Sequence, residues 1–218
     1  MHQTLQTIYE KRFAGDEQGR DRVWRVLTQD FFQRWVRPTD VVVDVGAGYC
    51  EFINNIRAAA KFALDLNPVS PLKAAPEVMV ISQDIALPWE IGSASTDVVF
   101  SSNFFEHLPT KEALQHCLRE IYRVLRPGGR MLAMGPNIRF CYQVYWDFFD
   151  HFLPLSDRSL TEALEITGFQ VERVIPRFLP FTMKGKTPPP ASVIRIYLRL
   201  PPIWVLFGKQ FLVIARKA

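Results

Sequence analysis

The sequence predicts an α/β fold built around a mainly parallel sheet. Two observations carry this prediction. First, a β-branched apolar run at 41–45 stops at Gly46 and Gly48, and an apolar pattern of helical period follows. Second, short polar residues follow successive apolar runs at a constant step of 19 residues from Gly46: Asp65, Asp84 and Asn103. One strand and one crossover in every ~20–30 residues is the rhythm of repeated βα units.

The N-terminal segment, residues 1–36, is predicted to be helical and amphipathic. Its apolar residues recur at helical spacing: Val23, Val26, Leu27, Phe31 and Trp35. Arg37 precedes Pro38, and a residue before proline avoids the helical region, so this lead-in should end there. We expect a strand at 41–45 and then a helix whose apolar face runs from Phe52 to Ala60.

Strands and helices alternate along the rest of the chain. Apolar runs bounded by turn residues predict the remaining strands: 61–66, 78–82, 97–102, 130–134, 170–175 and 210–215. One helix should run from Thr110, a good N-cap, to Val124, and another from Ser156 to Ile166, with Gly168 just past its end. The run 126–129, Arg-Pro-Gly-Gly, predicts a sharp turn.

The composition is that of a globular protein with one well-buried domain. The chain has 218 residues, of which 48% are hydrophobic and 22% charged. No apolar run is long enough to cross a membrane, and the polar N-terminus predicts no signal peptide. The three cysteines lack metal or redox spacing, so we assign no metal ion and expect a cytoplasmic protein with free thiols.

The charge is distributed unevenly. The whole chain carries 26 basic and 22 acidic residues, but from Arg177 onward there are eight basic residues and no acid. The first 176 residues therefore have 18 basic and 22 acidic residues, a net charge of −4. A basic C-terminal fifth indicates an anionic partner at that end.

The turn after the first strand is suited to binding a nucleoside. Gly46 and Gly48 have no Cβ, so the backbone can turn tightly and approach a ligand closely. The following helix would add free N–H donors at its N-terminus. Asp65 lies 19 residues after Gly46, where nucleotide-binding folds place a carboxylate that accepts both ribose hydroxyls. The alternative is that Asp65 is a strand-end cap or a surface acid.

With these segments in place, the chain resembles the class I S-adenosylmethionine-dependent methyltransferases. The resemblance covers roughly 41–175 and a strand near 210–215. It rests on five ordered segments: Asp44-Val45-Gly46-Ala47-Gly48, Asp65, Asp84-Ile85, Ser102-Asn103-Phe104-Phe105-Glu106-His107-Leu108 and Leu125-Arg126-Pro127-Gly128-Gly129. The most similar subgroup methylates small molecules and glycan or lipid precursors, and one of its strands ends in Asn-x-x-Glu-His.

The resemblance implies a doubly wound, mainly parallel seven-stranded sheet with helices on both faces. The whole chain would be one methyltransferase domain with an N-terminal helical lead-in and a C-terminal insertion between the last two strands. Its segments would be a lead-in, a cofactor-binding core, a substrate-side insertion and a basic apolar insertion: 1–38, 39–136, 137–156 and 176–208.

The resemblance also implies S-adenosylmethionine as the cofactor. Gly46 and Gly48 would face its methionine part, and Asp65 would bind its ribose. The remaining implied contacts are Asp84 and Ile85 at the adenine, Asn103 and Phe104 near the sulfonium, and Asp44 and Leu66 beside the turn and the ribose acid. Asp84 has an alternative role in shaping the turn before Pro88. A dinucleotide site would need a third glycine where Glu51 stands, which argues against a bound pyrophosphate.

The candidate catalytic residues lie at two places. In 145–152 a helix would put Asp147 and His151 on one face, where a carboxylate raises the basicity of an imidazole. Asp150 is the other acid able to orient His151, and His107 is a second candidate base. The alternative for 145–152 is a helical hairpin whose aromatic side chains fill a core.

The segment 176–208 has three interpretations. Ile194, Tyr197 and Leu198 share one helical face, and Arg195 and Arg199 share another. Such a basic amphipathic stretch can lie peripherally on the inner face of a membrane, or its arginines can bind a phosphate-bearing substrate. The third interpretation is a packed connection between the last two strands with a solvated basic rim.

The resemblance, together with the aromatic segment and the basic tail, implies in-line O-methylation of a small-molecule, glycan or lipid-linked acceptor. A sugar hydroxyl would need a base at neutral pH. Two alternatives stay open: a non-catalytic protein that binds S-adenosylmethionine, and an RNA or DNA methyltransferase recruited by the basic tail. Ser102-Asn103-Phe104-Phe105 replaces the Asn/Asp-Pro-Pro-aromatic run of nucleic-acid methyltransferases, so nucleic acid is not the expected partner.

Overall fold

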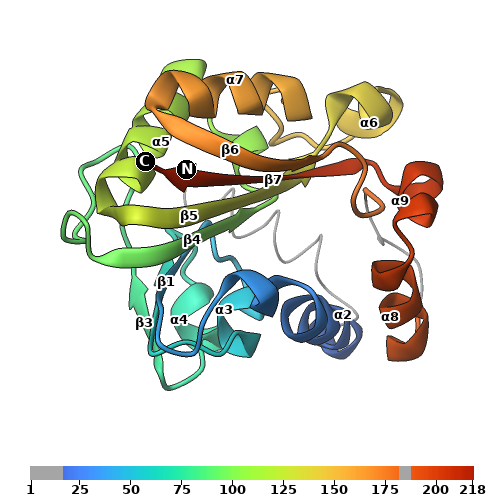
Figure 1. The fold of residues 1–218 in the computed structure, drawn as a ribbon, viewed down its shortest axis with the longest axis horizontal. Coiled ribbons are helices and arrows are strands. Elements are labelled where there is room, and N and C mark those ends of the chain that lie inside the picture. The colour runs from blue at the N-terminus through green and yellow to red at the C-terminus, as the bar shows by residue number, and fades with distance from the viewer. Residues whose placement is uncertain (1–16, 182–187) are drawn as a thin grey trace. The chain divides into compact units, whose positions relative to one another are not determined.

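The computed structural model describes residues 17–181 and 188–218 (Figure 1). Within them seven strands follow the order β3-β2-β1-β4-β5-β7-β6. The chain divides into two compact units, one with residues 17–84 and 188–201 and the other with 85–181 and 202–218. The predicted α/β fold class, a mainly parallel seven-stranded sheet with helices, is confirmed.

Three parallel strands form the sheet of the first unit. They are β1 (Val41–Val45), β2 (Ala60–Leu64) and β3 (Val78–Ile81), with β2 paired to both of the others. The predicted strands at 41–45, 61–66 and 78–82 are therefore confirmed. Val42, Val43 and Val45 are fully buried, as expected for a β-branched run in the interior.

The helices of the first unit are α2 (Glu17–Asp30), η1 (Phe32–Trp35), α3 (Glu51–Asn55), α4 (Ser70–Lys73) and α8 (Ala191–Arg199). Helix α2 packs against α3 and α8 through a face that includes the buried Val26 and Leu27. The predicted lead-in is thus confirmed from Glu17 onward, while residues 1–16 lie outside the described residues.

Helix α3 is shorter than predicted. It ends at Asn55, because Ile56 is extended and the amides of Ala59 and Ala60 donate to the carbonyl of Asp40 at 2.9 and 3.4 Å. Ala60 consequently begins β2 instead of completing a helical face, and the prediction for that residue was wrong. Strand pairing of Ala60 with a segment distant in sequence outweighed the apolar spacing that predicted a helix.

The second unit has a mixed four-stranded sheet. Strands β4 (Thr96–Ser102) and β5 (Leu125–Pro136) are parallel, and β7 (Gln210–Lys217) is antiparallel to both β5 and β6 (Phe169–Ile175). Helix α7 (Asp157–Thr167) packs against β6 and β7, and α5 (Lys111–Val124) packs against β5 (Figure 1). The unit also contains η2 (Phe105–His107), α6 (Ile138–Tyr145) and most of α9 (Pro201–Phe207).

Local capping signals in this unit act as predicted. The Thr110 hydroxyl accepts from the Ala113 amide at 3.2 Å, and Ser156 forms a reciprocal capping box with Ser159. Gly168 ends α7 with φ = 106°, a left-handed conformation that favours glycine. Side-chain and backbone groups near each helix end therefore set the boundaries of α5 and α7.

The predicted turn at 126–129 is an irregular start to β5. The strand register moves from Thr96 opposite Leu125 to Val98 opposite Arg130, so the chain bulges between these pairs. Gly128 has φ = 78°, and a Cβ on Gly129 would lie 2.9 Å from the carbonyl of Arg126. Gly128 is therefore favoured by its left-handed conformation, and Gly129 is required because the backbone approaches too closely for a Cβ.

Among the described residues between β6 and β7, α8 belongs to the first unit and most of α9 belongs to the second. Ile194 and Leu198 of α8 are buried, as is Trp204 of α9. Lys184 and Lys186 belong to residues 182–187, outside the described part. Over the residues that the structure describes, none of the helices combines the length and the apolar character that a membrane span needs.

Candidate active site

The glycine turn, residues 46–50, has the backbone geometry that its sequence predicts. Gly46, Gly48 and Cys50 have φ angles of 73°, 53° and 62°, all in the left-handed region. The amide of Gly46 donates to the Leu64 carbonyl at 2.9 Å, which fixes the turn at the carboxyl ends of β1 and β2. Because α3 is only five residues long, its dipole adds less to this turn than predicted.

Asp65 connects β2 to the glycine turn. Its carboxylate accepts from the Gly48 amide at 2.6 Å and from the Asn67 amide at 2.7 Å. Burial raises the pKa of Asp65, and these backbone donors oppose the rise by stabilising the charged form. A carboxylate fixed in this way is preorganised to accept further hydrogen bonds from a ligand hydroxyl.

Three acids surround the glycine turn. Burial, followed by the charges of Asp65 and Glu51, raises the pKa of Asp44 well above its ordinary value. Burial also raises the pKa of Glu51, although Arg20 lies 2.8 Å away and opposes the shift. Because all three acids are negatively charged when ionised, a cationic ligand at this turn would be stabilised. The sulfonium and amino groups of S-adenosylmethionine fit that requirement.

Cys50 lies in this turn without the features of a nucleophile. Its side chain is fully buried, and burial raises the pKa of its thiol to about 12. Cys117 and Cys141 are also buried and free. The expectation of free, buried thiols is confirmed for all three cysteines.

The other predicted cofactor residues follow strand ends in both units. Leu66 directly follows Asp65, and Asp84 ends the first unit. Ile85 begins the second unit and is buried, and its carbonyl accepts from the Trp89 indole at 3.2 Å. Asn103 follows β4 with φ = 49° and donates to the Ser102 hydroxyl at 3.0 Å; Phe104 comes next. The joint role of these residues in cofactor binding stays a prediction.

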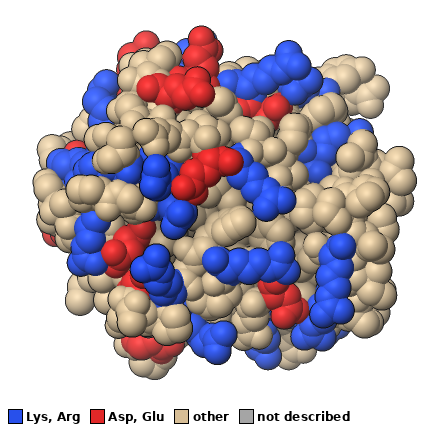
Figure 2. Space-filling view, in the orientation of Figure 1, with Lys and Arg blue, Asp and Glu red and all other residues tan. Residues whose placement is uncertain are grey.

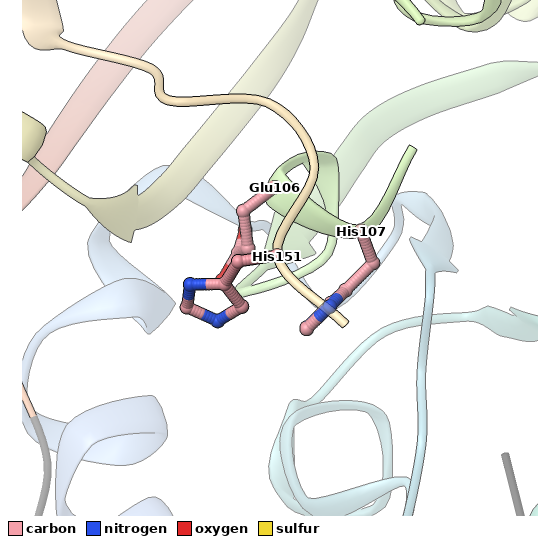
Figure 3. Close-up of side chains that lie close together, drawn as sticks. All are labelled: Glu106, His107 and His151. Carbon is pink, nitrogen blue, oxygen red and sulfur yellow. The ribbon is translucent and has the colours of Figure 1, made fainter. Parts of the chain in front are cut away.

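The candidate catalytic histidines meet in the second unit. Figure 3 shows Glu106, His107 and His151 side by side, and one donor atom from each lies within 4.8 Å of the other two. We call these three residues the Glu106 cluster. The amides of Phe152 and Leu153 donate to the Glu106 carbonyl at 2.7 and 3.1 Å. These two bonds hold the loop that carries His151 against η2.

Asp150, and not Asp147, is the acid that lies beside a candidate catalytic histidine. Helix α6 ends at Tyr145, so Asp147 and His151 do not share a helical face, and Asp147 is exposed. That helical prediction was wrong because the chain turns back to bond with Glu106. Asp150 instead approaches His107, whose Nδ1 lies 2.8 Å from the Asp150 carbonyl oxygen and 3.3 Å from its carboxylate.

Aromatic side chains fix the ring of His151. Phe148 stacks on it with 4.8 Å between ring centroids and 13° between planes, and Tyr145 lies 4.6 Å away. The Tyr145 hydroxyl donates to the Leu153 carbonyl, and Phe181 lies on another side of the imidazole. The alternative that aromatics of 145–152 fill a core holds for Tyr145, which is buried, but not for the exposed Trp146, Phe149 and Phe152.

Glu106 is a candidate site residue that the sequence alone does not single out. It is only 3% exposed, which is unusual for a carboxylate with no mechanistic or structural role. The sequence does hold one indication of this role: Glu106 is followed directly by His107, so an acid and an imidazole lie together just after a strand end. The third member, His151, lies 45 residues after Glu106 in the sequence, and only the fold brings it near.

Comparison with known proteins agrees with this fold. A family described as "Methyltransferase domain" matches residues 43–133. A solved S-adenosylmethionine-dependent methyltransferase from Archaeoglobus fulgidus superposes with a TM-score of 0.67 and 20% identity, covering 96% of this chain and 97% of that one. The fold is therefore that of class I methyltransferases.

Two curated relatives are more similar in sequence over shorter segments. Malonyl-[acyl-carrier protein] O-methyltransferase 1 of Coxiella burnetii is 35% identical over 53% of this chain and 42% of its own length. Demethylmenaquinone methyltransferase of Symbiobacterium thermophilum is 28% identical over 64% of this chain and 61% of its own. The match thus spans about half the length of these relatives. These likenesses show the fold of class I methyltransferases.

Proposed function

We propose that this protein transfers a methyl group from S-adenosylmethionine to a hydroxyl oxygen of a small-molecule, glycan or lipid-linked acceptor. The observation that carries the proposal is the Asp65 carboxylate, which bonds to the Gly48 amide and so joins the ribose acid to the glycine turn. The match to a relative named as an O-methyltransferase favours oxygen as the atom methylated.

The cofactor supplies a methyl carbon bonded to a positively charged sulfur. In the first unit, Asp65 accepts hydrogen bonds from the ribose hydroxyls, and the acids of the glycine turn complement the positive charge. These residues align the donor and leave proton transfer to other groups. Most of the rate then comes from positioning.

The acceptor hydroxyl is activated at the Glu106 cluster. His107 Nδ1 lies 2.8 Å from the Asp150 carbonyl oxygen, which only a protonated nitrogen can donate to, so Nε2 carries the free electron pair. The acceptor O–H bond breaks as its proton moves to that nitrogen, and the oxygen forms its new bond to carbon. His151 is the second candidate for this role.

Calorimetric titration with S-adenosylmethionine tests the cofactor site. Asp65→Ala should weaken binding by more than about 100-fold, because two hydrogen bonds to a charged group contribute ~1.5–3 kcal/mol each. Glu77→Gln is the control, since Glu77 is an exposed acid paired with Lys61 at 3.0 Å, at the opposite end of the strands. Equal affinity in wild type and Asp65→Ala would remove Asp65 from the site.

Transfer itself is tested with methyl-labelled cofactor and fractionated cell extract. We expect the label to appear in a hydroxyl-bearing small molecule, glycan or lipid fraction. Cofactor binding without label transfer to any fraction would instead favour the non-catalytic alternative. Labelled RNA or DNA would favour a nucleic-acid methyltransferase.

A further inference from the structure

We propose that the Glu106 cluster binds a divalent transition-metal ion through the Glu106 carboxylate and one imidazole nitrogen each of His107 and His151. The three donor atoms already lie within 4.8 Å of one another (Figure 3). Ligands on a tetrahedral ion with bonds of ~2.1 Å lie about 3.4 Å apart. Metal binding therefore brings the three donors from separations of at most 4.8 Å to about 3.4 Å.

The donor set favours a transition metal. Imidazole nitrogen is a good ligand for zinc, iron, cobalt and nickel, whereas magnesium and calcium prefer carboxylate, carbonyl and water oxygens. Two imidazoles with one carboxylate also leave open coordination positions, as catalytic sites require. The His107 side chain is 21% exposed, so a further ligand can approach from solvent.

The surroundings of His107 resemble an outer coordination shell. A metal-binding histidine usually donates its other ring N–H to a backbone carbonyl or carboxylate, which fixes the tautomer and ring orientation. The Asp150 carbonyl oxygen, 2.8 Å from Nδ1, and the Asp150 carboxylate oxygen, 3.3 Å from it, are placed for this role. Nε2 is then the coordinating atom.

The other two ligands are also held in position. Phe148 and Tyr145 restrict the His151 ring, and the loop is pinned by the bonds from Phe152 and Leu153 to the Glu106 carbonyl. The Glu106 carboxylate is buried, and burying its charge is costly unless a cation or hydrogen bonds offset it. A bound divalent cation would stabilise that charge directly.

The metal role rests in part on the proposed function. With the ion bound, His107 and His151 act as ligands, and an acceptor hydroxyl takes an open coordination position. Coordination lowers the pKa of that hydroxyl, so its proton leaves to solvent water and the oxygen stays on the metal. Proton transfer to the imidazole thus belongs to the metal-free protein, and activation by the ion belongs to the metal-bound protein.

Metal binding can be tested without cofactor or acceptor, which separates this inference from the proposed function. Chelator-treated full-length protein would be titrated with Co²⁺ while the visible absorption of the bound ion is followed, and Zn²⁺ would be measured by competition. We expect one ion per chain. Glu106→Gln, His107→Ala and His151→Ala should each weaken binding about 100-fold or more, and Asp150→Asn about 10-fold, in line with outer-shell changes.

His116→Ala is the matched control, because His116 is a half-buried histidine on α5 outside the cluster. It should bind Co²⁺ as the wild type does. Glu106→Gln keeps the size of the side chain, so it remains informative if a histidine variant fails to fold. Absence of a stoichiometric ion, or equal affinity in wild type and Glu106→Gln, would overturn the proposal.

Discussion

Asp44 is the most deeply buried acid of the glycine turn, at 3% exposure. Because burial raises its pKa, the folded protein holds a proton at Asp44 at pH values where the unfolded chain has released it. Stability from this group is fully present below the unfolded pKa of about 4 and is lost as pH rises through the higher folded pKa. The acid therefore disfavours folding at neutral pH.

We accordingly expect Asp44→Asn to unfold at a higher temperature than the wild type at pH 7. The amide has nearly the same shape and carries no charge, so the difference should shrink toward pH 4. Thermal melts between pH 4 and 8 measure this. Asp147→Asn, at an exposed aspartate, is the control and should follow the wild-type curve.

The proximity of Glu106, His107 and His151 could not be predicted from the sequence alone. Gly46, Gly48 and Asp65 could be placed from the sequence because each stands at a fixed distance from a strand end. His151 could not, since its position depends on a loop held by two backbone bonds to Glu106. Spacing of four suggested a helix there, but tertiary hydrogen bonds decided the conformation.

At the scale of whole elements, the helix ends that could be predicted from the sequence are those marked by a capping side chain or by a glycine. Helices α5 and α7 begin at Thr110 and Ser156, both of which cap as expected. The length of α3 was not predictable from its apolar period, because pairing of Ala60 in the sheet ended that helix early. Local chemistry sets such helix ends only where no strand competes for the residues.

Loss of the capping box at α7 should lower stability measurably. Ser156→Ala removes the acceptor of the Ser159 amide, a bond of 3.1 Å, and such caps contribute ~1 kcal/mol. For a protein of this size that corresponds to a fall of roughly 2–4 °C in Tm. Ser192→Ala, at an exposed serine of α8 that is not its N-cap, should leave the melt unchanged within error.

At the scale of the whole molecule, the basic C-terminal fifth is less available than its sequence suggested. Arg195 pairs with Asp30 at 2.8 Å, and Lys217 donates to the Tyr122 and Leu125 carbonyls at 2.6 and 2.8 Å. Arg177 and Arg216 also bond within the chain. Figure 2 shows Lys and Arg interspersed with Asp and Glu on the face in view. These contacts favour the packed connection with a basic rim.

We therefore expect only weak binding to nucleic acid and to anionic vesicles. Affinity for a random duplex should be no tighter than about 1 µM at physiological salt, the range of non-specific contacts. Fluorescence anisotropy at 50 and 200 mM salt measures this. Tight binding with a steep loss of affinity at the higher salt would restore the nucleic-acid alternative.

The Glu106 carbonyl has a wider consequence. By accepting both the Phe152 and Leu153 amides, this one oxygen uses its two lone pairs to anchor a segment that has no helix or strand of its own. The backbone that carries His107 and the loop that carries His151 are therefore joined through a single oxygen atom.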